Sequence, residues 1–156
     1  MSEKIENNIK VMEADIHSDE SVSLLSELSR SLNLITGNSG EASFSVNDME
    51  DEKSTFVIAK NGNKPAGCGA IRRIDDSTAE LKRMYAKEKG KGIGSFILNF
   101  LENKAGEFGY SRLICETRKI NTGACSFYMR NGFCIIPNYG KYQGRVDAVC
   151  FEKRIK

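Results

Sequence analysis

The spacing of apolar residues along the chain predicts alternating strands and helices. A loosely alternating run over 9–16 is typical of a first strand. A helix is expected from Ser18 or Ser21, either of which could cap it, to about Ile35. Its inner face would carry the residues at helical spacing, Leu24, Leu25, Leu28, Leu32 and Ile35. A glycine-rich break then ends the helix, and the acidic stretch 48–52 follows as a loop or a short helix.

The rest of the chain continues the alternation of strands and helices. Further strands are predicted at 54–60, 65–74, 79–86, 112–116, 133–136 and 146–151. The first two of these are joined by the turn 61–63, a hairpin signal. A long helix begins at Ile93, and its inner face would carry Ile93, Phe96, Ile97, Phe100, Leu101 and Phe108. A short helix runs from Asn121 to near Gly132. We therefore expect one α/β domain over 1–156, in which residues 1–8 could form a disordered tail.

The segment 89–95 reads Lys-Gly-Lys-Gly-Ile-Gly-Ser and lies directly before the long helix. Alternating glycines at a helix start leave backbone N–H groups uncovered, and the helix dipole adds partial positive charge there. Lys89 and Lys91 raise the local potential further. The pattern predicts an anion site suited to a pyrophosphate, and the alternative is a flexible, soluble turn. A P-loop is excluded because its motif is absent, and the dinucleotide fingerprint needs glycine where Ser95 stands.

This segment resembles the acetyl-CoA-binding loop of the GCN5-related N-acetyltransferases (GNAT), Arg/Gln-x-x-Gly-x-Gly/Ala, with Lys89 in the first position. The family's second signature, Asn-x-x-Ala-x-x-x-Tyr-x-x-x-Gly-Phe, is matched by Asn121, Ala124, Tyr128, Gly132 and Phe133. The resemblance covers residues 54–155. The family's usual Val-x-Pro-x-x-Arg-Gly stretch is replaced by 86–90, which is two residues shorter and lacks the proline. The resemblance implies the GNAT fold, a mixed central sheet of about six to seven strands with about four flanking helices and splayed parallel strands at the cofactor site.

The resemblance also implies where acetyl-CoA would bind. The residues that would hold it are Met84, Tyr85, Ala86, Lys89, Gly90, Lys91, Gly92, Ile93, Gly94, Ser95, Asn121 and Tyr128. The backbone N–H of Met84 would polarise the acetyl carbonyl, and Tyr128 would protonate the departing thiolate. The alternatives are a core aromatic for Tyr128 and a helix N-cap for Asn121.

Acetyl transfer to an amine also needs a base, because only the neutral amine attacks. The resemblance places Glu80 as general base next to the acceptor; the alternative is a cross-strand ion pair with Lys82 or Arg73. Arg83 could bind a carboxylate or phosphate of the substrate, or else neutralise Glu80 or Glu116. The loops 37–44 and 137–142 would line the acceptor cleft.

The expected function is transfer of an acetyl group from acetyl-CoA to a primary amine, preferably of a small molecule, by direct attack in a ternary complex. The enzyme would be an acyl-CoA-dependent N-acetyltransferase. The alternatives are a non-catalytic acyl-CoA-binding or sensing module, a protein N-acetyltransferase and a basic nucleic-acid binder. Glutamate and tyrosine at positions 80 and 128 favour turnover.

Composition adds limits to this picture. The chain is 40% hydrophobic and 28% charged, ordinary values for a globular protein, and it has no apolar run long enough to span a membrane. The N-terminus is polar, without the features of a secretory signal, so a cytoplasmic location is expected. A homodimer would be plausible by family habit alone.

The cysteines and the distribution of charge limit which metals, cofactors and macromolecules the chain is expected to bind. Five cysteines show no zinc spacing, so no metal is expected, and four of them, in strand-like runs, would be buried. Residues 1–56 carry 4 basic and 12 acidic side chains, whereas 57–156 carry 19 and 9. The basic part suits an anionic cofactor. Aromatic residues are not interleaved with the basic ones, which argues against nucleic acid.

Overall fold

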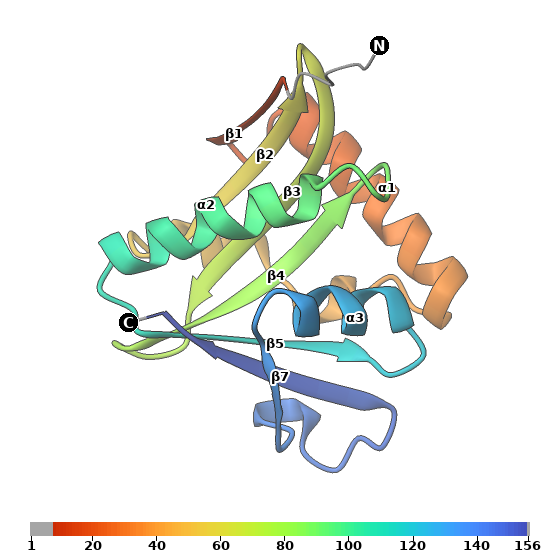
Figure 1. The fold of residues 1–156 in the computed structure, drawn as a ribbon, viewed down its shortest axis with the longest axis vertical. Helices are drawn as coiled ribbons and strands as arrows, with labels where there is room; N and C mark the ends of the chain where they lie inside the picture. The colour runs from red at the N-terminus through yellow and green to blue at the C-terminus, as the bar shows by residue number, and fades with distance from the viewer. Residues whose placement is uncertain (1–7, 156) are drawn as a thin grey trace.

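The computed structural model describes residues 8–155 as a mixed α/β domain built on one sheet (Figure 1). The predicted terminal tail, 1–8, falls almost entirely outside the described residues. The strands are β1 (Ile9–Glu13), β2 (Thr55–Asn61), β3 (Lys64–Arg73), β4 (Thr78–Ala86), β5 (Arg112–Arg118), β6 (Cys134–Ile136) and β7 (Ala148–Arg154). The helices are α1 (Asp19–Thr36), α2 (Ile93–Glu107) and α3 (Thr122–Arg130), with short 3₁₀ segments η1 (Glu41–Ser43), η2 (Val46–Glu50) and η3 (Gly140–Tyr142).

The seven strands lie in the order β1-β2-β3-β4-β5-β7-β6. Every neighbouring pair is antiparallel except β4 and β5, which are parallel and are connected through α2. A parallel pair needs such a crossover, whereas the antiparallel β2 and β3 need only the tight turn at Gly62. The α/β class and the expected number of strands are therefore confirmed.

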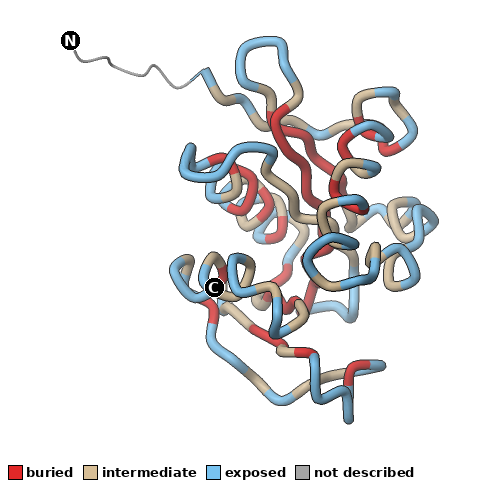
Figure 2. The backbone as a smooth tube through the Cα atoms, turned by 90° about the vertical axis from the view of Figure 1, so that its right-hand side faces the viewer, coloured by how far each residue is buried: buried red, intermediate tan, exposed pale blue. Residues whose placement is uncertain are grey.

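Helices cover both faces of the sheet. On one face α2 and α3 enclose the main core, in which Ile97, Leu98 and Leu101 of α2 meet Val57 and Ala59 of β2. The other face carries a second core between α1 and the sheet, formed by Ile16, Leu24, Phe56, Ile58, Cys68 and Ala70. Figure 2 shows that the buried backbone is concentrated in the central strands and in the inner sides of the helices. The strands β2 and β3 therefore carry apolar side chains on both faces.

The ends of α1 agree with the sequence pattern. Ser18 is its N-cap and accepts a hydrogen bond from the Ser21 N–H at 3.2 Å. Gly37 ends it in the left-handed conformation, at φ 79°, which glycine adopts without steric cost.

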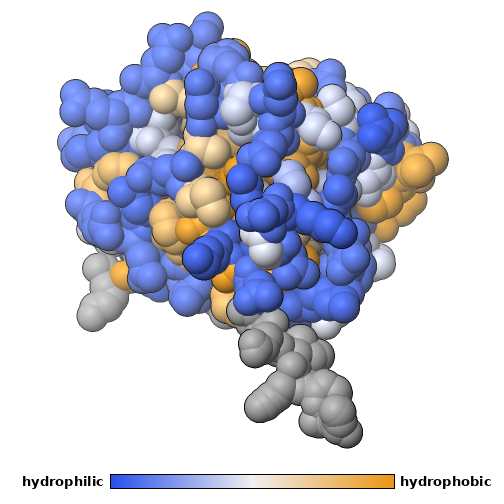
Figure 3. Space-filling model, turned by 90° about the horizontal axis from the view of Figure 1, so that it is seen from above, coloured by the Kyte–Doolittle hydropathy of each residue, from blue (hydrophilic) through white to orange (hydrophobic). Residues whose placement is uncertain are grey.

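Three side chains that were expected to be buried are exposed. Ile35 of α1 is 40% exposed and Phe96 of α2 is 39% exposed, because each lies at the margin of its helix's apolar stripe. In α2, Leu98 takes the inner place instead. Cys134 is exposed because it lies on β6, at the edge of the sheet. Figure 3 shows that the top of the molecule is mostly hydrophilic, with hydrophobic residues in patches between the hydrophilic ones.

Candidate functional site

The parallel strands β4 and β5 separate after a short paired start (Figure 1). Side chains from both strands line a cleft beyond that point. Only Thr78–Glu80 of β4 pair with residues of β5, namely Arg112–Ile114. The lining of the cleft comes from 81–84 of β4, from 116–118 of β5, from α3 and from several residues of the segment 28–43, which spans α1 and the loop after it. The expected splay of the parallel strands is therefore present.

The start of α2 has no side-chain cap. Gly92 precedes the helix with φ 77°, and Gly90 has the same φ. The other two helices are capped by the side chains of Ser18 and Asn121. The first N–H groups of α2 therefore remain available to an anion, and the helix dipole favours negative charge at this end.

The remaining residues of the loop divide between packing and solvent. Ile93 is buried in the main core. A Cβ added to Gly94 would lie 2.9 Å from the Phe127 ring, so glycine here allows α2 and α3 to approach closely. The Ser95 hydroxyl donates to Oδ1 of Asn131 at 3.3 Å.

The two lysines of the loop face solvent. Lys89 and Lys91 are exposed, and none of the ion pairs found among residues 8–155 includes either of them. Their ammonium groups would meet an anion at the start of α2 from the solvent side.

The end of β4 presents backbone rather than side chains to a ligand. Met84 lines the cleft and packs against the main core. The Tyr85 hydroxyl points to α1, where it donates to Oε1 of Glu27 at 3.1 Å. Ala86 pairs with Gly67 of β3. Because β5 has already diverged, the cleft-side edge of these residues is not paired with β5.

Tyr128 belongs both to the core and to the cleft. Its ring packs against Phe133 and Phe151, with centroids 5.4 and 5.7 Å apart, and the residue lines the cleft. Burial, with smaller effects from Cys115 and Glu116, raises the pKa of Tyr128 well above the usual range. The hydroxyl therefore keeps its proton at neutral pH.

Asn121 caps α3, as the alternative interpretation predicted. Its Oδ1 accepts a hydrogen bond from the Ala124 N–H at 3.2 Å. The residue also lines the cleft, so its amide lies within the same site as Tyr128.

Glu80 is committed to an ion pair and does not line the cleft. Arg72, directly opposite on β3, donates from Nε at 2.8 Å and approaches with Nη2 at 2.7 Å. The Tyr139 hydroxyl donates to the other carboxylate oxygen at 2.5 Å. The ion-pair alternative named Lys82 or Arg73 as the partner, and this was wrong, because register places Arg72 opposite and Arg73 pairs instead with acidic residues before and after β3.

Arg83 connects β4 to α1 and to the loop after it. Its Nη2 donates to Oγ of Ser29 at 2.6 Å, and its Nη1 donates to the Ser39 carbonyl at 3.1 Å. Desolvation lowers the pKa of Arg83 below its ordinary value. Arg83 lines the cleft but forms no ion pair with Glu80 or Glu116, so the neutralising role considered from sequence was wrong.

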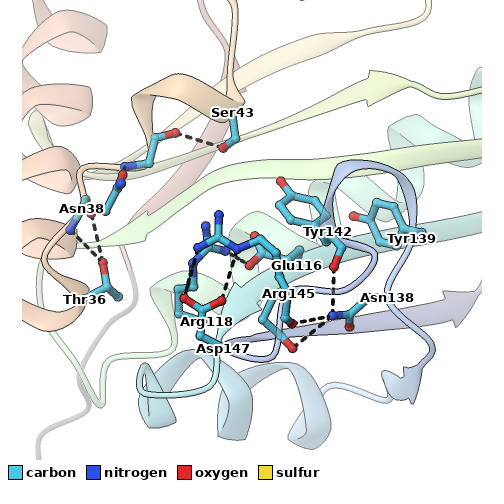
Figure 4. Close-up of polar contacts among 12 residues, drawn as sticks. Thr36, Asn38, Ser43, Glu116, Arg118, Asn138, Tyr139, Tyr142, Arg145 and Asp147 are labelled. Carbon is cyan, nitrogen blue, oxygen red and sulfur yellow. Dashed lines mark hydrogen bonds and ion pairs between the residues drawn. The ribbon is translucent and has the colours of Figure 1, made fainter.

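Two further cleft residues come from β5. Glu116 is paired with Arg118, whose guanidinium also approaches Asp147, and Figure 4 shows these side chains side by side. Burial raises the pKa of Glu116, although Arg118 opposes that shift. The sequence contained one signal of this position: Glu116 is a carboxylate that directly follows the apolar run Leu113–Cys115 of a predicted strand. Without knowledge of where β5 leaves β4, it could not be assigned to the cleft.

Two negative observations apply to residues 8–155. No group of three or more His, Cys, Asp or Glu side chains there could hold a metal ion. None of the helices there is both long and apolar enough to cross a membrane.

Comparison with known proteins agrees with this geometry. Residues 23–133 match the model of the acetyltransferase (GNAT) family. The uncharacterized N-acetyltransferase YsnE of Bacillus subtilis is 26% identical over 145 residues, which cover 90% of this chain and 96% of that protein.

Solved structures show the same fold at lower identity. A Klebsiella pneumoniae protein named as an acyl-CoA N-acyltransferase has a TM-score of 0.83 at 21% identity, covering 97% of this chain and 100% of its own. A GNAT family acetyltransferase from Elizabethkingia anophelis, solved with acetyl-CoA bound, has a TM-score of 0.70 at 20% identity, covering 96% and 99%. With the family match extending over more than half of its length, the chain belongs to the acetyltransferase (GNAT) family.

Proposed function

We propose that this protein transfers the acetyl group of acetyl-CoA to a primary amine of a small molecule that enters the cleft between β4 and β5. The carrying observation is that the divergent strands and Tyr128 border one cleft, while the uncapped start of α2 packs against α3, where Gly94 faces the ring of Phe127 beside Tyr128. The pyrophosphate of acetyl-CoA would lie at Gly92, and its extended arm would follow the free edge of β4 toward Met84.

In the proposed reaction the amine nitrogen attacks the thioester carbonyl carbon, the carbon–sulfur bond breaks, and CoA leaves as a thiolate. The Met84 N–H would stabilise the developing oxyanion. The amine proton needs an acceptor at the cleft. Glu116 is better suited than Glu80 to accept the amine proton, because Glu116 lines the cleft and burial raises its pKa toward the working range of a base.

Tyr128 is proposed to donate to the departing sulfur. In water a tyrosine, of pKa about 10, is a weaker acid than a thiol, of pKa about 8.5, so complete proton transfer would be uphill. Burial raises the pKa of Tyr128 further, and desolvation of the thiolate in the same cleft would raise the pKa of the thiol too. Donation of a hydrogen bond that strengthens as the carbon–sulfur bond breaks is consistent with both effects.

The test begins with titration calorimetry of acetyl-CoA and CoA, with nucleic acid at the same salt as a control. Release of free CoA thiol is then followed with a panel of primary amines. Saturable binding and amine-dependent thiol release are expected. Binding without release for any small amine or N-terminal peptide would indicate a CoA-binding module, and absence of binding would contradict the assignment of the glycine loop.

A further inference from the structure

A bulge in β4 turns two consecutive cations toward the same face of the sheet. Pairing with β3 shifts between Cys68 and Ala70, so that Arg83 and Met84 stand opposite one residue, and Arg83 has φ 55°. A regular strand would alternate faces, whereas here Lys82 and Arg83 both contact elements on the α1 side of the sheet.

Both cations have only uncharged hydrogen-bond partners. Lys82 is 9% exposed, and its Nζ lies 3.4 Å from Oγ of Ser43 and 3.4 Å from the hydroxyl of Tyr142. Arg83 donates to Ser29 and to main-chain carbonyls of α1 and the loop after it. None of the ion pairs formed within residues 8–155 includes either cation.

The nearby carboxylates already have arginine partners. Glu80 and Glu116 favour the charged form of Lys82 from a distance, but Glu80 is paired with Arg72 and Glu116 with Arg118. Desolvation is the largest influence on Lys82 and lowers its pKa. A buried ammonium without a counter-charge costs folding free energy, and such costs concentrate where a ligand supplies the missing charge.

The position of Lys82 fits a ligand. It lines the cleft together with Ser43, and Figure 4 shows Ser43 and Tyr142 both lying above Glu116. One ammonium and two hydroxyls converge here, and they make a compact set of donors for one anionic group once the Ser43 hydroxyl turns from the Gly40 carbonyl, to which it donates at 3.0 Å. The donors of Arg83 are already largely engaged, so Lys82 has the greater spare capacity.

We infer, on the basis of the proposed acetyl transfer, that the acceptor amine also carries a carboxylate, which Lys82 binds together with the hydroxyls of Ser43 and Tyr142. The substrate class is therefore a small amino acid rather than a neutral amine or polyamine. Arg83 adds positive potential on the neighbouring wall and positions the loop that carries Ser43.

The test compares matched acceptors. Amino acids with the amine at increasing distance from the carboxylate are assayed against their primary amides and against the amines that lack the carboxyl group. The acid is expected to exceed its amide at least about tenfold in kcat/KM, chiefly through KM. In Lys82→Met that preference should fall to within about twofold, Lys82→Arg should retain part of it, and Lys10→Met, at an exposed site on β1, should leave it unchanged.

The outcomes separate this inference from the proposed function. Wild-type protein that acetylates amides or phosphorylated amines as well as the acids would overturn the inference and leave acetyl transfer intact. If no amine is acetylated, calorimetry with acetate and glutarate on the CoA-bound protein shows whether Lys82 binds a carboxylate. Carboxylate binding that Lys82→Met removes would support the anion site while contradicting acetyl transfer, and no binding would overturn both.

Discussion

Glu80 and Glu116, on the neighbouring strands β4 and β5, show how environment divides the roles of one residue type. Glu80 is 1% exposed, and both of its oxygens accept hydrogen bonds from Arg72 or Tyr139. Glu116 has one partner, Arg118, and borders open space. The donors on Glu80 occupy both of its oxygens, whereas Glu116 borders the cleft and burial raises its pKa, so Glu116 is the better placed to accept a proton from a substrate.

Glu116→Gln therefore tests the base. Below the pKa of the amine, kcat should fall about 10²-fold or more, because the ammonium has lost its proton acceptor, while the Kd for acetyl-CoA stays unchanged. The loss should shrink as pH rises toward the pKa of the amine, where the neutral nucleophile is supplied by solvent. Asp147→Asn is the matched control, because it removes the other carboxylate near Arg118, one that is not among the residues lining the cleft. A pH–rate profile identical to that of the wild type would contradict the assignment.

Glu80→Gln should act mainly on stability. The change removes the buried one of the two carboxylates that Arg72 contacts and leaves Asp48 as its remaining anion, so the free energy of unfolding should fall by about 1–3 kcal/mol in urea titrations. Tyr139→Phe should lose less and should not add fully to it, because the two share one hydrogen bond. Unchanged stability with a large loss of kcat would instead restore Glu80 as the base.

Lys82→Met should stabilise the fold at neutral pH, the reverse of what removing a structural ion pair does. In the wild-type protein, folding lowers the pKa of Lys82. The unfolded chain therefore binds more protons than the folded protein does between that lowered pKa and about 10.5. The free energy of unfolding of the wild type should therefore rise with pH in this window relative to that of Lys82→Met. The stability advantage of the variant should shrink as a result. Glu80, Arg72, Lys141 and Glu116 face the same amine and are present in both proteins. Unfolding in urea at several pH values measures this, and a less stable variant would indicate a structural lysine.

At the level of elements, the sequence predicts more of the fold than of the site. Strands and helices follow from periodicity, Ser18 from cap chemistry, and the uncapped start of α2 from its glycines. The bulge at Arg83 does not follow, because a left-handed arginine has no local signal. The choice of Arg72 as the partner of Glu80 depends on strand register, which is a tertiary property.

The start of α2 can be tested by charge at one glycine. Gly92→Glu should reduce acetyl-CoA affinity at least about 100-fold, because a carboxylate would occupy the anion site and repel the pyrophosphate. Gly109→Glu is the control: Gly109 also has a positive φ, 95°, and open space around it, but it lies beyond the other end of α2. Calorimetry with acetyl-CoA on both variants separates the effect of a negative charge at the anion site from the effect of backbone strain at a substituted glycine. Equal affinities in the two would place the pyrophosphate elsewhere.

On the scale of the whole molecule, two parts of one sheet meet at a narrow seam. The strands β1 to β4 with α1 and α2 form one part, and β5 to β7 with α3 form the other. At the seam, β4 and β5 pair only over Thr78–Glu80 and Arg112–Ile114. Beyond it, the core between α2 and α3 holds the parts together on one face, and the cleft separates the strands. A ligand in that cleft would contact both parts.

Acetyl-CoA should therefore stabilise the whole domain. At a concentration of 100 times its Kd, linkage adds about 2.7 kcal/mol, which corresponds to a rise in Tm of about 5–10 °C for a domain of this size. Hydrogen exchange should slow most at 81–86 of β4 and 115–118 of β5, the backbone that borders the cleft. Gly92→Glu at the same ligand concentration should keep no more than about 0.4 kcal/mol of this stabilisation, because a 100-fold weaker affinity brings its Kd to the ligand concentration, and its protection should fall accordingly. Protection confined to the start of α2 would mean that the pyrophosphate binds while the acetyl arm lies outside the cleft, and catalysis between the strands would then be contradicted.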